Sequence, residues 1–205
     1  LLACGGSPIM SDDVQEVEEI TALCAGLTLN LGTLNQRTIP SMRSAGRRAN
    51  DLGHQVVLDP VGAGASTLRT AAARQLLEEI RFSAVRCNMS ELKAILSGSG
   101  DTRGVDANLD DAVTEENLDD AAGFVRKAAA RLGAVTAVTG AIDLVSDGAA
   151  CYVIRNGRPE MGRVTGTGCQ PSALVCAYLA ANPDRTLEAA AAAVASMGLA
   201  GELAW

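Results

Sequence analysis

The sequence contains a single histidine, His54, among its 205 residues. No cysteine is adjacent to His54, so a zinc site is not expected, and a lone histidine excludes most Ser-His-Asp and Cys-His schemes of catalysis. Its place between a helical and a strand pattern predicts a solvated loop residue. The chemistry of this chain must therefore come from other residue types.

Long apolar runs, paired cysteines and positive charge are also missing. No run approaches the roughly 18 residues that span a bilayer. The net charge of −7 speaks against nucleic acid or an anionic membrane as the main partner. The six cysteines form no CxxC pair, and no secretory segment precedes them, which predicts reduced thiols in a cytoplasmic protein. The phosphate loop GxxxxGK[ST] is absent, and no GxGxxG follows the first strand pattern.

Helical and strand periods alternate along most of the chain. Because strands alternate with helices, we predict a three-layer α/β domain with a mostly parallel central sheet, helices on both faces and an antiparallel edge. The turn dipeptides Asp147-Gly148 and Asn156-Gly157 predict the antiparallel strands. Helices are predicted at 12–24, 35–53, 70–80, 90–97, 114–133, after Gly168 and at 188–205; strands at 26–32, 55–60, 82–88, 134–140 and within 143–161; and a surface loop at 97–113.

Polar residues follow four of the predicted strands. They are Asn30 with Thr33, Asp59, Arg86 with Asn88, and Thr139, which Gly140 follows. Since the carboxyl ends of parallel strands meet at one edge of a sheet, we expect these side chains to converge on a crevice there. An arginine, a threonine and the carboxylates of Asp59 and Glu91 suit a phosphate with a hydrated magnesium ion. Taken singly, Asp59 could cap the turn before Pro60, and Glu91 could belong to a capping box.

Cys169 stands where the glycine-rich turn Gly166–Gly168 becomes an apolar helix. The first backbone N–H groups of a helix favour a thiolate or a bound anion, so a functional thiol is one interpretation. The alternative is that Cys169 is a small buried hydrophobic residue, which free cysteines often are. The residues alone leave both interpretations open.

Several motifs now occur in order along nearly the whole chain, and together they closely resemble the hydroxyethylthiazole kinase family of the ribokinase-like superfamily. The motifs "VLDPVGAGA" and "TGTGC" together are specific to this family. The motifs are SPIM (7–10), LNLGTLN (29–35), VVLDPVGAGAST (56–67), RCNMSE (86–91), GVDA (104–107), AVTG (137–140) and VTGTGC (164–169).

The resemblance implies a kinase that uses ATP and Mg²⁺ to phosphorylate the primary alcohol of 4-methyl-5-(2-hydroxyethyl)thiazole in thiamine salvage. It implies a homotrimer with active sites between subunits. The residue roles that it implies are ATP contacts for Arg86 and Thr139, a magnesium neighbourhood for Asp59 and Glu91, substrate contacts for Met10 (toward a neighbouring subunit), Gly166 and Asn30, and a catalytic base for Cys169.

Some features depart from the pattern of the family. Cys87 stands where its members usually have glycine, which would bring a side chain close to the nucleotide, and "QPSA" (170–173) replaces a more apolar stretch. We expect one domain over 1–205 that lacks terminal segments of the family. Two other functions stay open: another vitamin-precursor kinase, of the hydroxymethylpyrimidine type, and a binding protein that has lost catalysis.

Overall fold

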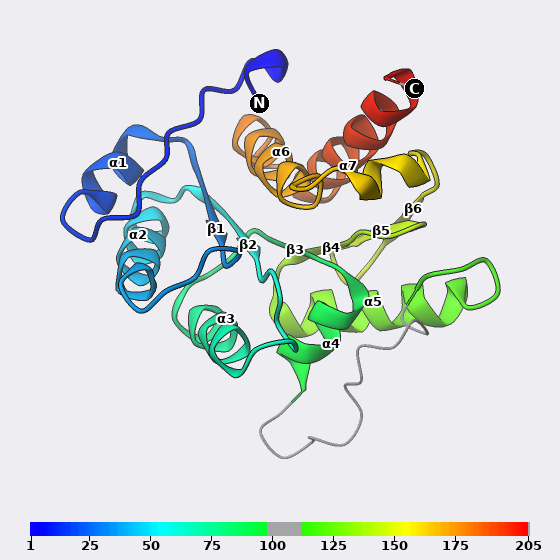
Figure 1. Cartoon of the computed structure of the whole chain (residues 1–205), viewed down its shortest axis with the longest axis horizontal. Helices are drawn as coiled ribbons and strands as arrows, with labels where there is room; N and C mark the ends of the chain where they lie inside the picture. The colour runs from blue at the N-terminus through cyan, green and yellow to red at the C-terminus, as the bar shows by residue number, and fades with distance from the viewer. Residues whose placement is uncertain (98–111, 205) are drawn as a thin grey trace.

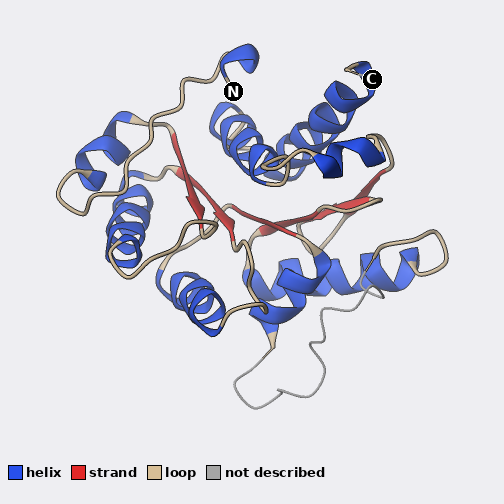
Figure 2. Cartoon of the chain, viewed as in Figure 1, coloured by secondary structure: helices blue, strands red, loops and turns tan. Residues whose placement is uncertain are grey.

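A six-stranded sheet in the order β1-β2-β3-β4-β5-β6 forms the middle layer of the computed structural model, which describes residues 1–97 and 112–204 (Figures 1 and 2). The first four strands are parallel, and β5 and β6 continue the sheet as an antiparallel edge. The strands are β1 (Gly26–Asn30), β2 (Gln55–Asp59), β3 (Ala84–Cys87), β4 (Val135–Val138), β5 (Asp143–Ser146) and β6 (Cys151–Ile154). The predicted fold class is confirmed.

Helices cover both faces of this sheet. Figure 1 shows α6 and α7 on one face and α2 to α5 on the other, while α1 packs beside α2. The helices are α1 (Val17–Leu23), α2 (Thr38–Leu52), α3 (Thr67–Glu79), α4 (Met89–Leu96), α5 (Leu118–Leu132), α6 (Cys169–Ala181) and α7 (Thr186–Leu203), with short 3-10 helices at Leu2–Cys4 and Pro159–Arg163. None of the described helices is long and apolar enough to cross a membrane.

One hydrophobic core lies on each face of the sheet, and the side chains of β2 are divided between them. Val56 and Leu58 belong to the core under α2 to α5, and Val57 belongs to the core under α6 and α7. All three are fully buried, and each such side chain contributes about 1.5–3 kcal/mol through its removal from water. The sheet is therefore fixed from both sides, and its carboxyl edge has a defined register.

That register aligns the ends of the first strands. Asn30 of β1 is paired with Asp59 of β2, and Cys87 of β3 with Val138 of β4. Gly53 ends α2 at φ +71°, as predicted, and Pro40 lies in the first turn of that helix. The strand ends thus bring Asn30, Asp59, Arg86 and Thr139 to one edge.

Several predicted elements differ in extent from the observed ones. The helix predicted from residue 70 begins at Thr67 and the helix predicted from residue 114 begins at Leu118, and two further differences have a clear local cause. The helix predicted from residue 12 begins at Val17, because the Asp13 carboxylate accepts the N–H of Gln15 and its carbonyl those of Glu16 and Val17, forming a turn instead. The strand predicted after Gly157 is the 3-10 helix Pro159–Arg163. Pro159 has no N–H to donate to a neighbouring strand.

Three smaller predictions have mixed outcomes. His54 lies in a loop but is half-buried, and its Nδ1 is buried without a hydrogen-bond partner in the part of the chain that the structure describes, so the prediction of a solvated residue was wrong. The alanine-rich tract forms α7 and is buried at Ala190 and Ala193, although Leu203 is 80% exposed. Most of the predicted loop 97–113, with the GVDA motif, lies outside the described residues.

Candidate active site

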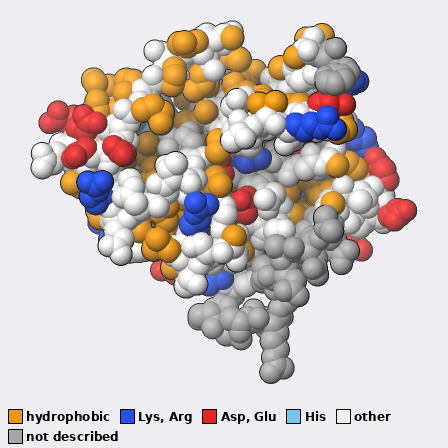
Figure 3. Space-filling view, viewed as in Figure 1, with side chains coloured by type: hydrophobic (Ala, Val, Ile, Leu, Met, Phe, Trp, Pro, Cys, Tyr) orange, Lys and Arg blue, Asp and Glu red, His pale blue; other side chains and the backbone are white. Residues whose placement is uncertain are grey.

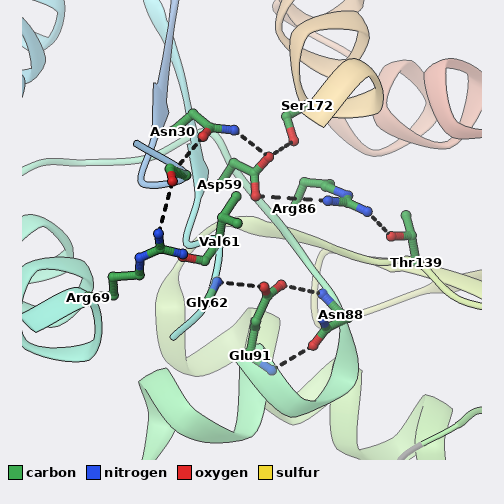
Figure 4. Close-up of polar contacts among 11 residues, drawn as sticks. Asn30, Asp59, Val61, Gly62, Arg69, Arg86, Asn88, Glu91, Thr139 and Ser172 are labelled. Carbon is green, nitrogen blue, oxygen red and sulfur yellow. Dashed lines mark hydrogen bonds and ion pairs between the residues drawn. The ribbon is translucent and has the colours of Figure 1, made fainter. Parts of the chain in front are cut away.

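Asp59 lies at the centre of the polar network at the carboxyl edge of the sheet (Figure 4). Its side chain is fully buried, and its Oδ2 accepts hydrogen bonds from Asn30 Nδ2 at 2.9 Å and Ser172 Oγ at 2.7 Å. Its Oδ1 has no hydrogen-bond partner in the described chain and lies 3.9 Å from Arg86 Nη1. Asp59 is therefore no cap of the turn before Pro60, because its hydrogen bonds join three separate elements.

The groups around Asp59 shift the pKa of its carboxyl in opposite directions. Burial raises the pKa of its carboxyl from 3.8 to about 6, and the Glu91 charge also raises this pKa. The hydrogen bond from Ser172, the charge of Arg86 and the hydrogen bond from Asn30 act in the opposite direction. A buried carboxylate with a perturbed pKa in a polar network is a common property of functional sites.

Arg86 connects Asp59 to the next strand end. Its side chain is 11% exposed, and its Nη2 donates a hydrogen bond to Thr139 Oγ1. A Cβ built on Gly168 would lie 3.4 Å from Nη1, so the backbone before α6 packs against the guanidinium. The Nε of Arg86 is buried without a partner in the described structure. Arg86 thus joins β2, β4 and the turn before α6 at a single positive charge.

A cavity of about 450 Å³ opens beside this arginine. Arg86, Thr139 and Gly168 line one end, and Asp143 lies there too, accepting the N–H of Gly140 at 2.8 Å. Burial raises the pKa of the Asp143 carboxyl to about 6, against the effects of the Gly140 N–H and Arg86. The rest of the wall is mixed: it includes the apolar side chains of Met161, Val194 and Met197 and the polar side chains of Asn156 and Arg158. The cavity therefore suits a ligand that carries both anionic and apolar groups.

Glu91 holds two loops below Asp59 in Figure 4. Its Oε1 accepts the N–H of Gly62 at 2.9 Å, and its Oε2 accepts the N–H of Asn88 at 3.0 Å. Asn88 Oδ1 in turn accepts the N–H of Glu91 at 2.8 Å, which completes the capping box of α4. The capping interpretation is confirmed, and it is compatible with a further role because each carboxylate oxygen has a second lone pair.

Arg69 of α3 forms hydrogen bonds to the loops after β1 and β2. Its Nη2 donates to the carbonyl of Gly32 at 2.9 Å, and its Nη1 donates to the carbonyl of Val61 at 3.3 Å. Gly62, at φ +76°, leaves no room for a Cβ, which would lie 2.5 Å from Arg69 Nη1. The loops after β1 and β2 are therefore fixed relative to each other by one arginine.

The turn before α6 has the geometry that its glycines predict. Gly166 has φ +90°, and its carbonyl accepts the N–H of Cys169 at 3.0 Å and that of Gln170 at 3.1 Å. Cys169 is the first residue of α6 and is exposed, so the interpretation of a buried hydrophobic residue was wrong. Pro171 is the third helical residue, within the first turn, where it interrupts no hydrogen bond.

Of the site residues predicted from the sequence, Arg86 and Thr139 line the cavity. The others do not: Met10, Asn30, Asp59, Glu91, Gly166 and Cys169. Met10 is 92% exposed in the segment before α1, and Figure 3 shows hydrophobic side chains gathered over that part of the molecule. Asn30 does not line the cavity; it holds Asp59 and accepts the N–H of Gly32 at 2.8 Å. Cys87 does not line it either: it is buried in the core, and burial raises the pKa of its thiol. The expectation that Cys87 brings a side chain to the nucleotide is not supported.

Sequence reasoning missed Ser172, Asp143 and Arg69. Ser172 carried a signal, because it belongs to the stretch 170–173, whose polar residues depart from the more apolar pattern of the family. Asp143 and Arg69 carried none, since their roles depend on loops whose relative positions the sequence does not give.

The donor set at this edge fits a magnesium ion only in part. Asp59 offers a buried carboxylate oxygen without a partner, while both oxygens of Glu91 already accept a backbone N–H. The described residues include no group of three or more His, Cys, Asp or Glu side chains that could hold a metal. Asp59 and Glu91 could thus accept hydrogen bonds from the water shell of a magnesium ion carried by a phosphate ligand.

The arrangement of strands and helices in this chain is shared with known proteins. A ribokinase-like superfamily protein from Enterococcus faecalis superposes with a TM-score of 0.63 at 14% identity, over 92% of this chain and 60% of that one. At this low sequence identity, the similarity shows a shared fold and nothing about function. The chain has the ribokinase-like fold.

Matches at higher sequence identity show the family within this fold. The sequence matches the hydroxyethylthiazole kinase family over residues 1–205. It is 53% identical to the hydroxyethylthiazole kinase of Clostridium acetobutylicum over 205 residues, which cover 100% of this chain and 75% of that one. The structure of the Pyrococcus horikoshii hydroxyethylthiazole kinase protein superposes with a TM-score of 0.86 at 36% identity, over 99% of this chain and 72% of that one. The chain belongs to the hydroxyethylthiazole kinase family.

Proposed function

We propose that this kinase transfers the γ-phosphate of ATP to the primary alcohol of 4-methyl-5-(2-hydroxyethyl)thiazole, a salvage step towards thiamine. Membership of the hydroxyethylthiazole kinase family carries the choice of reaction. The observation that supports the site is the network of Asp59, Arg86 and Thr139, of which Arg86 and Thr139 line the cavity. Decay to a binding protein is disfavoured because this network is intact.

In this proposal the triphosphate lies at the polar end of the cavity. Arg86 and Thr139 contact its oxygens, and the base lies toward Met161 and Met197. A guanidinium suits this place because it can donate to two phosphate oxygens at once. Magnesium carried by the triphosphate would supply neutralisation of the phosphate charge, with Asp59 and Glu91 accepting hydrogen bonds from its water shell.

The alcohol binds on the side of Gly166 and Cys169, with Asn30 contributing from the end of β1. Its hydroxyl oxygen forms a bond to the γ-phosphorus while the bond from that phosphorus to the β,γ-bridging oxygen breaks. ADP leaves, and Cys169 takes the hydroxyl proton. Phosphoryl transfer has a loose transition state, so most of the rate enhancement comes from positioning and charge neutralisation, with the base secondary. The exposure of Cys169 at the start of α6 supports this role.

The assembly in this proposal is a homotrimer in which Met10 completes the thiazole pocket of a neighbouring subunit. The exposure of Met10 supports the idea, because a side chain of that size gains most from burial against a partner. Use of ATP and the six free thiols both suit the cytoplasm.

The test is to incubate the protein with Mg-ATP and a panel of vitamin-precursor alcohols. We expect ADP release with the hydroxyethylthiazole and at most slow release with hydroxymethylpyrimidine or pyridoxal. Preference for another alcohol would overturn the substrate assignment. Binding of the thiazole without turnover would overturn the catalytic one.

A further inference from the structure

Ser172 has a fully buried hydroxyl. It lies in the first turn of α6, and Leu174 and Val175 of the following turn pack into the core under α6 and α7. Burying a hydroxyl is unfavourable unless it is hydrogen-bonded, and here the partner is the Asp59 carboxylate, 2.7 Å away on β2 (Figure 4). The hydrogen bond therefore joins two elements that are 113 residues apart in the sequence.

The contact determines which oxygen of Asp59 is left for other partners. Ser172 and Asn30 both donate to Oδ2, from α6 and from β1. Two donors on one oxygen fix the rotation of the carboxylate, so that Oδ1 lies toward Arg86 without a hydrogen-bond partner in the described chain. Removing the Ser172 donor would leave only Asn30 to hold this orientation.

The same hydrogen bond also anchors the start of α6. Ser172 is three residues after Cys169, so both belong to the same helical turn. The backbone of Gly168, just before that turn, packs against the Arg86 guanidinium. The position of Cys169 relative to the strand ends thus depends on the contacts of this turn with Asp59 and Arg86.

We propose that Ser172 is a positioning residue for phosphoryl transfer: it orients the Asp59 carboxylate and holds the first turn of α6, with Cys169, against the carboxyl end of β2. The inference rests on the proposed function, because the orientation affects catalysis only if Asp59 and Cys169 act in it.

Three variants separate this role from a general packing effect. Ser172→Ala removes the donor, and we expect kcat to fall about tenfold or more, as for loss of a hydrogen bond to a charged group. The KM for ATP changes little because Arg86 and Thr139 remain. Ser172→Thr keeps the hydroxyl and restores most of kcat. Ser41→Ala is the matched control: Ser41 is 3% exposed, and its hydroxyl donates to the Arg37 carbonyl within α2, so this variant keeps wild-type kinetics.

A readout independent of turnover follows the anchoring itself. Hydrogen exchange of the backbone amides in the first turn of α6, measured without nucleotide, accelerates in Ser172→Ala and stays at the wild-type rate in Ser41→Ala. An unchanged exchange rate in Ser172→Ala would overturn the anchoring.

A double-mutant cycle with Asp59→Ala completes the test, because alanine removes the oxygen that accepts the Ser172 hydrogen bond. If Ser172 acts through the Asp59 carboxylate, Ser172→Ala changes kcat less than about twofold once that carboxylate is gone. An equal loss in both backgrounds, or wild-type kcat for Ser172→Ala while Asp59→Ala is impaired, refutes the positioning role and leaves the proposed function standing. Wild-type kcat for Asp59→Ala itself contradicts the role of Asp59 in the proposed function.

Discussion

The substitution Asp59→Asn should make the fold more stable at neutral pH while it lowers activity. Asp59 has no exposed surface, and burial raises its pKa from 3.8 to about 6. At about 1.36 kcal/mol for each pKa unit, this difference corresponds to about 3 kcal/mol against the ionised form in the folded protein. The carboxylate that the site requires is therefore kept at the expense of stability.

The sign of the pH dependence follows from the direction of the shift. The folded state holds the proton more tightly than the unfolded state, so the contribution of Asp59 to stability is complete below about pH 4. It is lost as the pH rises through about 6. An asparagine cannot titrate, and its amide oxygen can still accept the hydrogen bonds of Asn30 and Ser172.

Urea unfolding in buffers with EDTA, from about pH 4 to about pH 8, measures this contribution. We expect the free energy of unfolding of Asp59→Asn, relative to wild type, to rise by about 3 kcal/mol across that range. The control is Asp12→Asn, since Asp12 is exposed in the N-terminal segment. If the curves of wild type and Asp59→Asn run parallel, burial does not oppose the charge of Asp59 and the reasoning is wrong.

Four further predictions concern the proposed roles. Glu91→Gln raises the magnesium requirement, because Glu91 would face the water shell of the ion; an unchanged magnesium dependence contradicts this. Arg86→Lys lowers kcat/KM for ATP about tenfold or more, since one ammonium cannot replace the planar fork that Arg86 presents between Thr139 and Asp59; wild-type nucleotide kinetics would refute the assignment. Activity depends on oligomerisation if Met10 completes a neighbouring site, and sedimentation of a fully active monomer would disprove it. Cys169→Asp stays active, because a carboxylate is ionised at neutral pH, whereas Cys169→Ala and Cys169→Ser lose at least about tenfold in kcat; wild-type kcat in the alanine variant would leave Cys169 without a catalytic role.

The sequence determined the layer order of this protein because its periodicity follows from local geometry. Strands such as 55–60 are apolar on both faces, which only a sheet covered on both sides satisfies, and Gly53 marks a helix end that needs a positive φ. The convergence of Asn30, Asp59, Arg86 and Thr139 also followed, since parallel strands end at one edge.

Only the tertiary structure decided which groups these residues contact. The capping role of Glu91 could be predicted from its spacing to Asn88, but its contact with Gly62 could not, because it joins positions 29 residues apart. In the same way, Ser172 bonds Asp59 only because α6 crosses the sheet at the end of β2. Sequence patterns fix which residues share an element and a face. Which oxygen of Asp59 is held by Ser172 and which is left toward Arg86 depends on packing between distant elements, and local periodicity carries no information about it.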